Sequence, residues 1–163
     1  MSVRIFSGPR EPAGFPGRAA TAFVLVGAPG SGKTTEALRL LAQDLVHRYI
    51  LSRDVEREAN GCLPVSPHPE QEDAITVALE SGARALLAMG WDVIVDTTNV
   101  QPGAVDRWRA VAARSGAKFQ LVDLTGVPVE QCITNVAARA AAGGRDVPEQ
   151  VIRAMHGRCS PAG

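Results

Sequence analysis

The chain has 163 residues, as many basic as acidic residues, and a hydrophobic share of 45%. This size and composition are typical of one folded domain and argue against a disordered chain. The formal net charge of zero argues against a protein that coats long stretches of nucleic acid phosphate, and it leaves room for a local basic site. The three cysteines are odd in number and widely spaced, which indicates neither a disulfide framework nor a zinc site.

The first 20 residues are rich in glycine and proline and show neither a helical nor a strand period. We therefore expect residues 1–20 to form a flexible arm ahead of a folded domain at residues 21–160. The arm contains no apolar core of signal-peptide length, and the longest apolar stretch, residues 83–95, is too short and too charged to span a membrane. We expect a cytoplasmic protein, in the host cytoplasm if the gene belongs to a phage, with no membrane partner.

A strand, a glycine-rich loop and a helix are predicted directly after the arm. Residues 23–26 form a continuous apolar run that Gly27 ends, as in a strand buried on both faces. From Thr34 onward apolar residues recur at helical spacing, namely at Ala37, Leu38, Leu41, Leu45 and Val46. Residues 49–52 then predict a second short strand, and the glycine and prolines of residues 60–69 predict a loop.

Helices and strands alternate over the rest of the chain, with helices predicted at residues 72–89 and 105–112 and strands at 93–95 and 119–124. Gly90 and Gly116 are expected to end the two helices. Two further helices are expected after Pro128, and Asp146 and Glu149 are spaced as a capping box for the last of them. This alternation predicts an α/β fold of three layers, in which helices flank a central, mostly parallel sheet.

The glycine-rich loop at residues 27–34 fits the pattern G-x-x-x-x-G-K-[ST] of a phosphate-binding loop. Small residues let backbone N–H groups curl around phosphate oxygens, Lys33 can reach the β- and γ-phosphates, and the Thr34 hydroxyl can coordinate magnesium. The strand before the loop and the helix after it are the context that this motif requires. We therefore predict a P-loop NTPase fold that binds ATP and Mg²⁺ through Gly27, Ala28, Pro29, Gly30, Ser31, Gly32, Lys33, Thr34 and Thr35.

Two carboxylates follow predicted strands at the same edge of the sheet. Asp54 follows the second strand, and with Arg57 it suits phosphate transfer to a hydroxyl, where a carboxylate accepts the proton and an arginine neutralises charge. On spacing alone, a solvated helix start with local ion pairs explains Arg53, Asp54, Glu56 and Arg57 equally well. Asp96 ends the third strand, and we favour a magnesium-holding role with Thr34 over that of a strand-end turn residue.

Arg139 and Arg145 bracket a short stretch of alanine and glycine between the last two predicted helices. This connection could close as a lid and bring both guanidinium groups onto phosphates. A surface loop with solvated arginines fits the spacing as well. The predicted catalytic set is therefore Lys33, Asp54, Arg57, Arg139 and Arg145.

Over residues 22–158 the sequence resembles the kinase domain of bacteriophage and bacterial polynucleotide kinases. The motifs that carry the resemblance occur in the family's order, at residues 27–34, 52–57, 95–99 and 139–148. The order of these motifs is more specific than any single match. The chain leaves no room for the phosphatase domain that accompanies this kinase domain in the family, so we expect the kinase half alone.

The resemblance implies roles for the candidate residues. Asp54 would be the general base for the acceptor hydroxyl, Arg57 would contact an acceptor phosphate, and Asp96 would line the acceptor and metal side. The two arginines that bracket residues 140–144 would belong to a lid over ATP, and this stretch is longer than is usual in the family. Thr134 stands where the family typically has an arginine in the lid helix.

We predict an ATP- and Mg²⁺-dependent phosphotransferase that moves the γ-phosphate to a nucleic acid hydroxyl, at a 5′-hydroxyl end or on a hydroxymethylated base in phage DNA. An enzyme that grips only a terminal or flipped nucleotide needs few phosphate contacts, which agrees with the zero net charge. A small-molecule kinase of the same fold is the nearest alternative, because a fold does not name its acceptor. A nucleotide-binding switch or adaptor without phosphotransfer, with the arm as a partner contact, is the alternative of another class.

Overall fold

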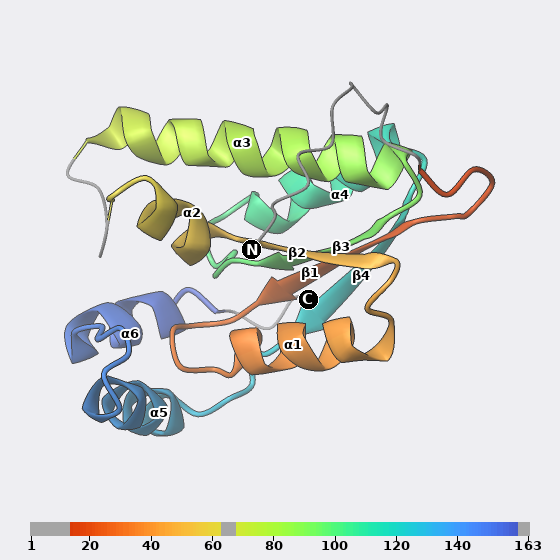
Figure 1. Cartoon of the computed structure of the whole chain (residues 1–163). Coiled ribbons are helices and arrows are strands. Elements are labelled where there is room, and N and C mark those ends of the chain that lie inside the picture. Colours follow the sequence, from red (N-terminus) through yellow and green to blue (C-terminus); the bar gives the residue numbers. More distant parts are fainter. Residues whose placement is uncertain (1–13, 63–67, 160–163) are drawn as a thin grey trace, which may run out of the picture.

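The computed structural model of the chain describes residues 14–62 and 68–159, and the expected alternation of strands and helices is present within them (Figure 1). The strands are β1 (Thr21–Val26), β2 (Arg48–Ser52), β3 (Asp92–Asp96) and β4 (Lys118–Asp123). The helices are α1 (Lys33–Gln43), α2 (Arg53–Ala59), α3 (Pro69–Ala88), α4 (Ala104–Arg114), α5 (Val129–Ala141) and α6 (Glu149–His156). Within this described part, every helix is too short or too polar to cross a bilayer.

The four strands of the described residues form one parallel sheet in the order β2-β3-β1-β4. Val95 of β3 lies in register with Val24 of β1 on one side and with Leu51 of β2 on the other. Because parallel strands all end at the same edge, the segments that follow β1, β2 and β3 meet there. The predicted α/β class and the parallel sheet are therefore confirmed.

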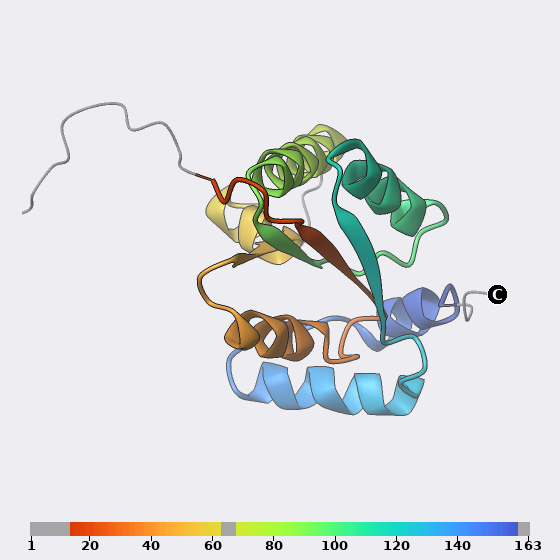
Figure 2. The same ribbon diagram turned by 90° about the vertical axis from the view of Figure 1, so that its right-hand side faces the viewer.

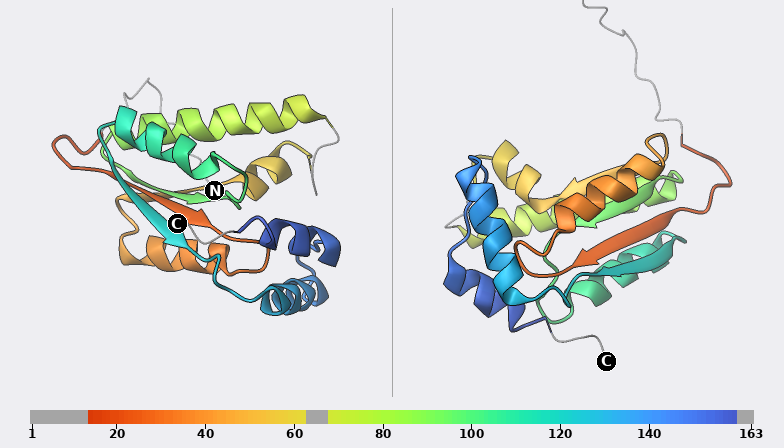
Figure 3. Two further views of the ribbon diagram at one scale, coloured as in Figure 1. Left: turned by 180° about the vertical axis from the view of Figure 1, so that it is seen from behind. Right: turned by 90° about the horizontal axis from the view of Figure 1, so that it is seen from below.

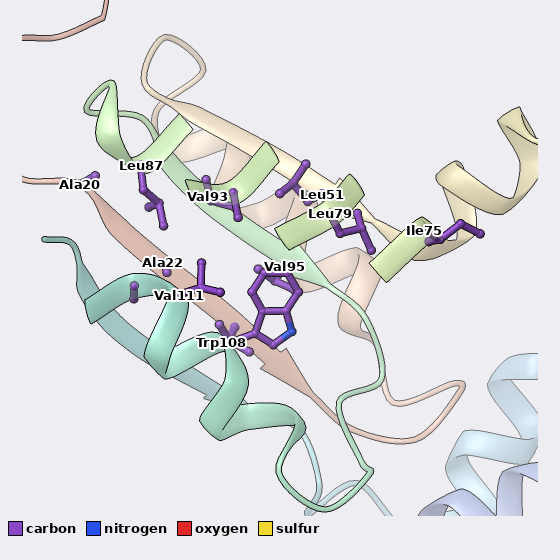
Figure 4. Close-up of a cluster of buried hydrophobic side chains, with 13 residues drawn as sticks. Ala20, Ala22, Leu51, Ile75, Leu79, Leu87, Val93, Val95, Trp108 and Val111 are labelled. Carbon is purple, nitrogen blue, oxygen red and sulfur yellow. The ribbon is translucent and has the colours of Figure 1, made fainter. Parts of the chain in front are cut away.

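Helices cover both faces of the sheet, as the end-on view in Figure 2 shows. On one face α3 and α4 bury a cluster with the sheet that includes Leu79, Val93 and Trp108 (Figure 4). On the other face α1 packs Ala37 and Leu40 against the sheet. Figures 1 and 3 place α2, α5 and α6 at the end toward which the strands point. The carboxyl edge of the sheet is thus framed by these three helices.

The turn after α1 corrects the predicted length of that helix. Leu45 and Val46, expected on its apolar stripe, lie beyond its last residue and are 72% and 62% exposed. The carboxylate of Asp44 accepts the backbone N–H groups of Val46 and His47 at 3.2 and 3.1 Å. This local side-chain to backbone bonding offers the chain a turn in place of another helical turn.

The predicted capping box at the start of α6 is wrong. Pro148 occupies the N-cap position, and no side chain caps the helix there. The carboxylate of Asp146 instead accepts the N–H of the next residue, Val147, at 2.8 Å. Asp146 lies two residues before the N-cap, and Glu149 is the first helical residue and not the third, as a capping box would require.

Residues 14–20 of the predicted flexible arm pack against the amino-terminal side of the sheet, and residues 1–13 lie outside the described residues. The ring of Phe15 contacts the rings of His47 and Trp91, with centroids 4.5 and 5.2 Å away. Arg18 donates two hydrogen bonds of 2.9 Å to the buried carboxylate of Asp92. Side-chain contacts to distant residues hold this segment, which explains why it shows no local period.

Candidate active site

The glycine-rich loop joins β1 to α1 and lies against α5. Gly30 has a φ of 83°, and a side chain at this position would collide with the backbone carbonyl of Cys132 in α5. Asn135, also in α5, donates a 2.8 Å hydrogen bond to the backbone oxygen of Gly30. The tip of the loop is therefore held by α5 on the side away from the sheet. Only glycine combines this positive φ with so close an approach.

Lys33 is the first residue of α1 and is only 9% exposed. Its Nζ donates a 2.8 Å hydrogen bond to the backbone oxygen of Ala28, within the loop itself. Burial lowers the pKa of this ammonium group, and the neighbouring Asp96 acts in the opposite direction. A phosphate in the loop would supply the negative charge that a buried ammonium group needs.

Thr34 and Asp96 meet because β1 and β3 are neighbours in the sheet. The Thr34 hydroxyl donates a 2.9 Å hydrogen bond to Oδ2 of Asp96, the last residue of β3. Burial raises the pKa of the Asp96 carboxyl, so a nearby cation would favour its ionised form. A hydroxyl and one carboxylate fit Mg²⁺, which binds few protein oxygens and takes its other ligands from water and phosphate. These residues would hold the ion beside the nucleotide phosphates.

Replacing Asp96 by asparagine is expected to raise the Mg²⁺ concentration needed for half-maximal nucleotide binding by about tenfold, since one charged ligand is lost. The amide oxygen of the new side chain can still accept the Thr34 hydrogen bond, so the fold is expected to persist. Mg²⁺ titrations of fluorescent-nucleotide binding measure this shift, with Asp106→Asn on the exposed surface of α4 as the control. An unchanged Mg²⁺ requirement would remove Asp96 from the proposed metal site.

The segment after β3 ties that strand to the glycine-rich loop. Asn99 has a φ of 52° and donates a 2.7 Å hydrogen bond to the backbone oxygen of Leu25. Its side-chain oxygen accepts hydrogen bonds from the Thr97 hydroxyl and from the indole of Trp108. Asn99 therefore links the end of β1 to the segment that follows β3 and to α4.

Asp54 and Arg57 lie in α2, which begins directly after β2. The Arg57 guanidinium donates a 3.0 Å hydrogen bond from Nη1 to Oδ1 of Asp54. Arg145 forms an ion pair with the same carboxylate oxygen from the connection between α5 and α6. The Asp54 side chain remains 56% exposed, which leaves its other oxygen accessible from the cavity.

Glu72, which the sequence analysis did not single out, links both arginines of α2 to α3. Its carboxylate accepts hydrogen bonds of 2.7 and 2.8 Å from Nε and Nη2 of Arg57 and one of 3.0 Å from Arg53. The hydrogen bonds from Arg57 lower the pKa of Glu72 to about 2. No motif marks Glu72, because its relation to Arg57 depends on how α2 and α3 pack.

The two predicted lid arginines have different contacts. Nε of Arg139 donates a 2.8 Å hydrogen bond to the backbone oxygen of Arg145, which fixes the shape of the α5–α6 connection. Arg145 reaches Asp54 on the far side of the cavity. Between them they join the end of α5 to the start of α2, so this connection lies over the site.

One cavity of about 710 Å³ brings most of these groups together. It includes the predicted residues Pro29, Gly30, Gly32, Lys33, Thr34, Thr35, Asp54, Arg57, Asp96, Arg139 and Arg145. Gly27, Ala28 and Ser31 of the loop do not line the cavity, and Ala28 and Ser31 are buried. The sequence analysis assigned no role in the site to the other lining residues, namely Arg53, Thr98, Asn135, Asp146, Val147, Pro148, Val151 and Met155. Five basic and three acidic side chains face this space.

Val147, Val151 and Met155 form an apolar wall on one side of the cavity. The last two are four residues apart on α6 and so share one helix face. Ile152, on a neighbouring face, is buried against α5. This helical spacing was readable from the sequence, although only the tertiary arrangement shows which apolar residues face a cavity.

The model of a family described as AAA domain matches residues 23–162. Among curated proteins, none matches the sequence. A chain in the structure of the Pnkp1/Rnl/Hen1 RNA repair complex is 25% identical, with a TM-score of 0.74 and coverage of 87% of this chain. The present chain spans only 44% of the length of that one.

Two small-molecule kinases are also similar in structure. The Mycobacterium tuberculosis APS kinase CysC, in complex with AMPPNP and APS, is 26% identical with a TM-score of 0.56; the match covers 82% of this chain and 83% of that one. A gluconokinase from Sinorhizobium meliloti 1021 is 16% identical with a TM-score of 0.56, over 86% of this chain and 75% of that one. The gluconokinase likeness shows a shared fold alone.

Proposed function

The chain belongs to the AAA domain family and has a P-loop kinase fold, and we propose that it transfers the γ-phosphate of ATP to a hydroxyl group of a nucleic acid. One observation carries this proposal. A single cavity holds the phosphate-binding residues Lys33 and Thr34 together with Asp54 and Arg57, which suit an acceptor. In phosphate transfer to a hydroxyl, a carboxylate accepts the proton of the acceptor and an arginine offsets charge on the group in transfer.

In the proposed reaction the acceptor oxygen attacks the γ-phosphorus, the bond to the bridging oxygen of ADP breaks, and Asp54 accepts the hydroxyl proton. Lys33 would bind β- and γ-phosphate oxygens, and the arginines would offset charge on the group in transfer. Mg²⁺, held by Thr34 and Asp96, would supply further charge neutralisation at the phosphates. The α5–α6 connection would exclude water from the transfer.

A nucleic acid 5′-hydroxyl end is the acceptor that we favour. Arg53 and Arg57 lie together on α2 at the wall of the cavity, where they suit a phosphate next to the accepting hydroxyl. The excess of basic over acidic lining residues gives a local cationic site on a chain of zero net charge. The similarity to a chain of an RNA repair complex supports the same substrate class.

A small-molecule alcohol is the second candidate acceptor. The likeness to an APS kinase in complex with AMPPNP and APS, over most of both chains, favours it. A cavity of about 710 Å³ is also in the size range of small-molecule sites. This candidate uses the same donor residues and differs only in what lies beside Asp54.

A panel of acceptors separates these candidates. [γ-³²P]ATP and Mg²⁺ are offered with 5′-hydroxyl DNA and RNA oligonucleotides, with DNA containing hydroxymethylated bases, and with small alcohols including APS and gluconate. We expect label on an oligonucleotide. Transfer to small alcohols alone would overturn the nucleic acid proposal, and nucleotide binding with no transfer to any acceptor would favour a switch or adaptor.

A further inference from the structure

Glu72 lies outside the cavity, yet it contacts the arginine that faces the proposed acceptor. It sits in the first turn of α3, where the positive end of the helix dipole favours a carboxylate. Its two oxygens accept the Nε and Nη2 hydrogen bonds of Arg57 side by side, at 2.7 and 2.8 Å. This is the two-pronged geometry in which a carboxylate fixes the plane of a guanidinium group.

The two hydrogen bonds to Glu72 determine which donors of Arg57 remain available to a substrate. With Nε and Nη2 held by Glu72, the Nη1 edge is directed toward Asp54, at 3.0 Å. The Arg57 side chain is 14% exposed, so it has little space in which to adopt another orientation. The donors near Nη1 are thus presented to the cavity beside the proposed general base.

Glu72 also offsets the repulsion between two like charges. Arg53 and Arg57 are four residues apart on α2, a spacing that brings their charges together on one helix face. The Glu72 carboxylate bonds both, and the Thr76 hydroxyl accepts a further 2.8 Å hydrogen bond from Arg53. With a pKa of about 2, Glu72 stays ionised over the whole neutral range. Both arginines can therefore remain ordered at the wall of the cavity.

We propose that Glu72 is a positioning residue for the acceptor, which acts by holding the guanidinium group of Arg57 in the orientation that binds the substrate beside Asp54. The proposal rests on the proposed function, since it assigns Arg57 to the acceptor side. Glu72 itself touches neither substrate. Its removal should weaken the use of the acceptor and leave ATP binding unchanged.

Glu80 provides a matched control on the same helix. Its side chain is 19% exposed, against 23% for Glu72, and it also lies near two arginines, Arg84 and Arg107. Those arginines are on α3 and α4, away from the cavity. Glu80→Ala therefore reports what the loss of a comparable surface carboxylate costs in stability alone.

The kinetic test uses Glu72→Ala, Glu72→Gln and Glu80→Ala with the best acceptor of the panel. We expect the KM for the acceptor to rise about tenfold in Glu72→Ala, less in Glu72→Gln, and not in Glu80→Ala, with the KM for ATP unchanged. In an Arg57→Ala background, Glu72→Ala should have no further effect on acceptor use. Equal effects of Glu72→Ala with and without Arg57 would overturn the proposal.

A second measurement tests the positioning without any transfer reaction. In NMR spectra of the arginine Nε–H groups, the Arg57 signal should be protected from exchange in the wild type and in Glu80→Ala, and lost in Glu72→Ala. Persistence of this signal in Glu72→Ala would overturn the proposal. Absence of transfer in the acceptor panel would instead count against the proposed function.

Discussion

Replacing Lys33 by methionine is expected to reduce phosphate transfer by about a thousandfold, the scale seen when a charge-stabilising donor is removed from an active site. Methionine has a similar length but cannot bind the β- and γ-phosphates. Steady-state and single-turnover rates measure the loss, with Lys118→Met, at an exposed position of β4, as the control. Retention of most of the activity in Lys33→Met would refute the assignment of Lys33 to the ATP-binding site.

The same variant is expected to be as stable as the wild type or more stable near neutral pH. Burial lowers the pKa of Lys33, so the folded state binds this proton less tightly than the unfolded state does. Folding near neutral pH therefore has a free-energy cost, because the proton of Lys33 is held less tightly in the folded state. This cost decreases as the pH rises through the lowered pKa of Lys33. The advantage of Lys33→Met in thermal unfolding should then shrink at alkaline pH. A large loss of stability would show that the hydrogen bond from Lys33 to Ala28 stabilises the fold by more than burial of the ammonium group costs.

Replacing Asp54 by asparagine is expected to lower kcat by about a hundredfold to ten-thousandfold, the range for loss of a general base. Asparagine keeps an oxygen that can accept hydrogen bonds from Arg57 and Arg145, so the wall of the cavity should persist. ATP affinity should be unchanged, because Lys33 and the glycine-rich loop hold the donor. Calorimetric ATP binding and transfer rates measure the two effects separately.

The matched control for Asp54→Asn is Glu58→Gln, which removes an exposed carboxylate from the same helix outside the cavity. Glu58→Gln should leave both kcat and ATP affinity unchanged. If Asp54→Asn retained full activity, the carboxylate would be only the partner of two arginines. If it lost ATP affinity as well, Asp54 would belong to the nucleotide site.

The phosphate loop and the parallel sheet could be predicted from the sequence because their signals are local. A continuous apolar run, a glycine-rich loop and a helical period follow one another at residues 23–43, and each pattern indicates the backbone conformation of its own segment. Asp54 and Asp96 were predictable as candidates for a related reason. Each follows a strand, and parallel strands bring their ends to one edge.

Other parts of the site depend on tertiary packing and could not be predicted in this way. Glu72 is 15 residues from Arg57 and meets it only because α3 packs beside α2. Asn135 reaches Gly30 across 105 residues. The segment at residues 14–20 has no period, because its order comes from the pairing of Arg18 with Asp92, 74 residues away. Such contacts leave no pattern in the local sequence.

The most direct test of the central claim is the product balance of one turnover. Enzyme in excess over [γ-³²P]ATP is mixed with a 5′-hydroxyl oligonucleotide, and ADP, free phosphate and labelled 5′ ends are measured over time. We predict one labelled 5′ end for each ADP formed, and formation of both products at least about a hundredfold more slowly by Asp54→Asn. Release of free phosphate in place of labelled ends, or labelling by Asp54→Asn at the wild-type rate, would contradict the account.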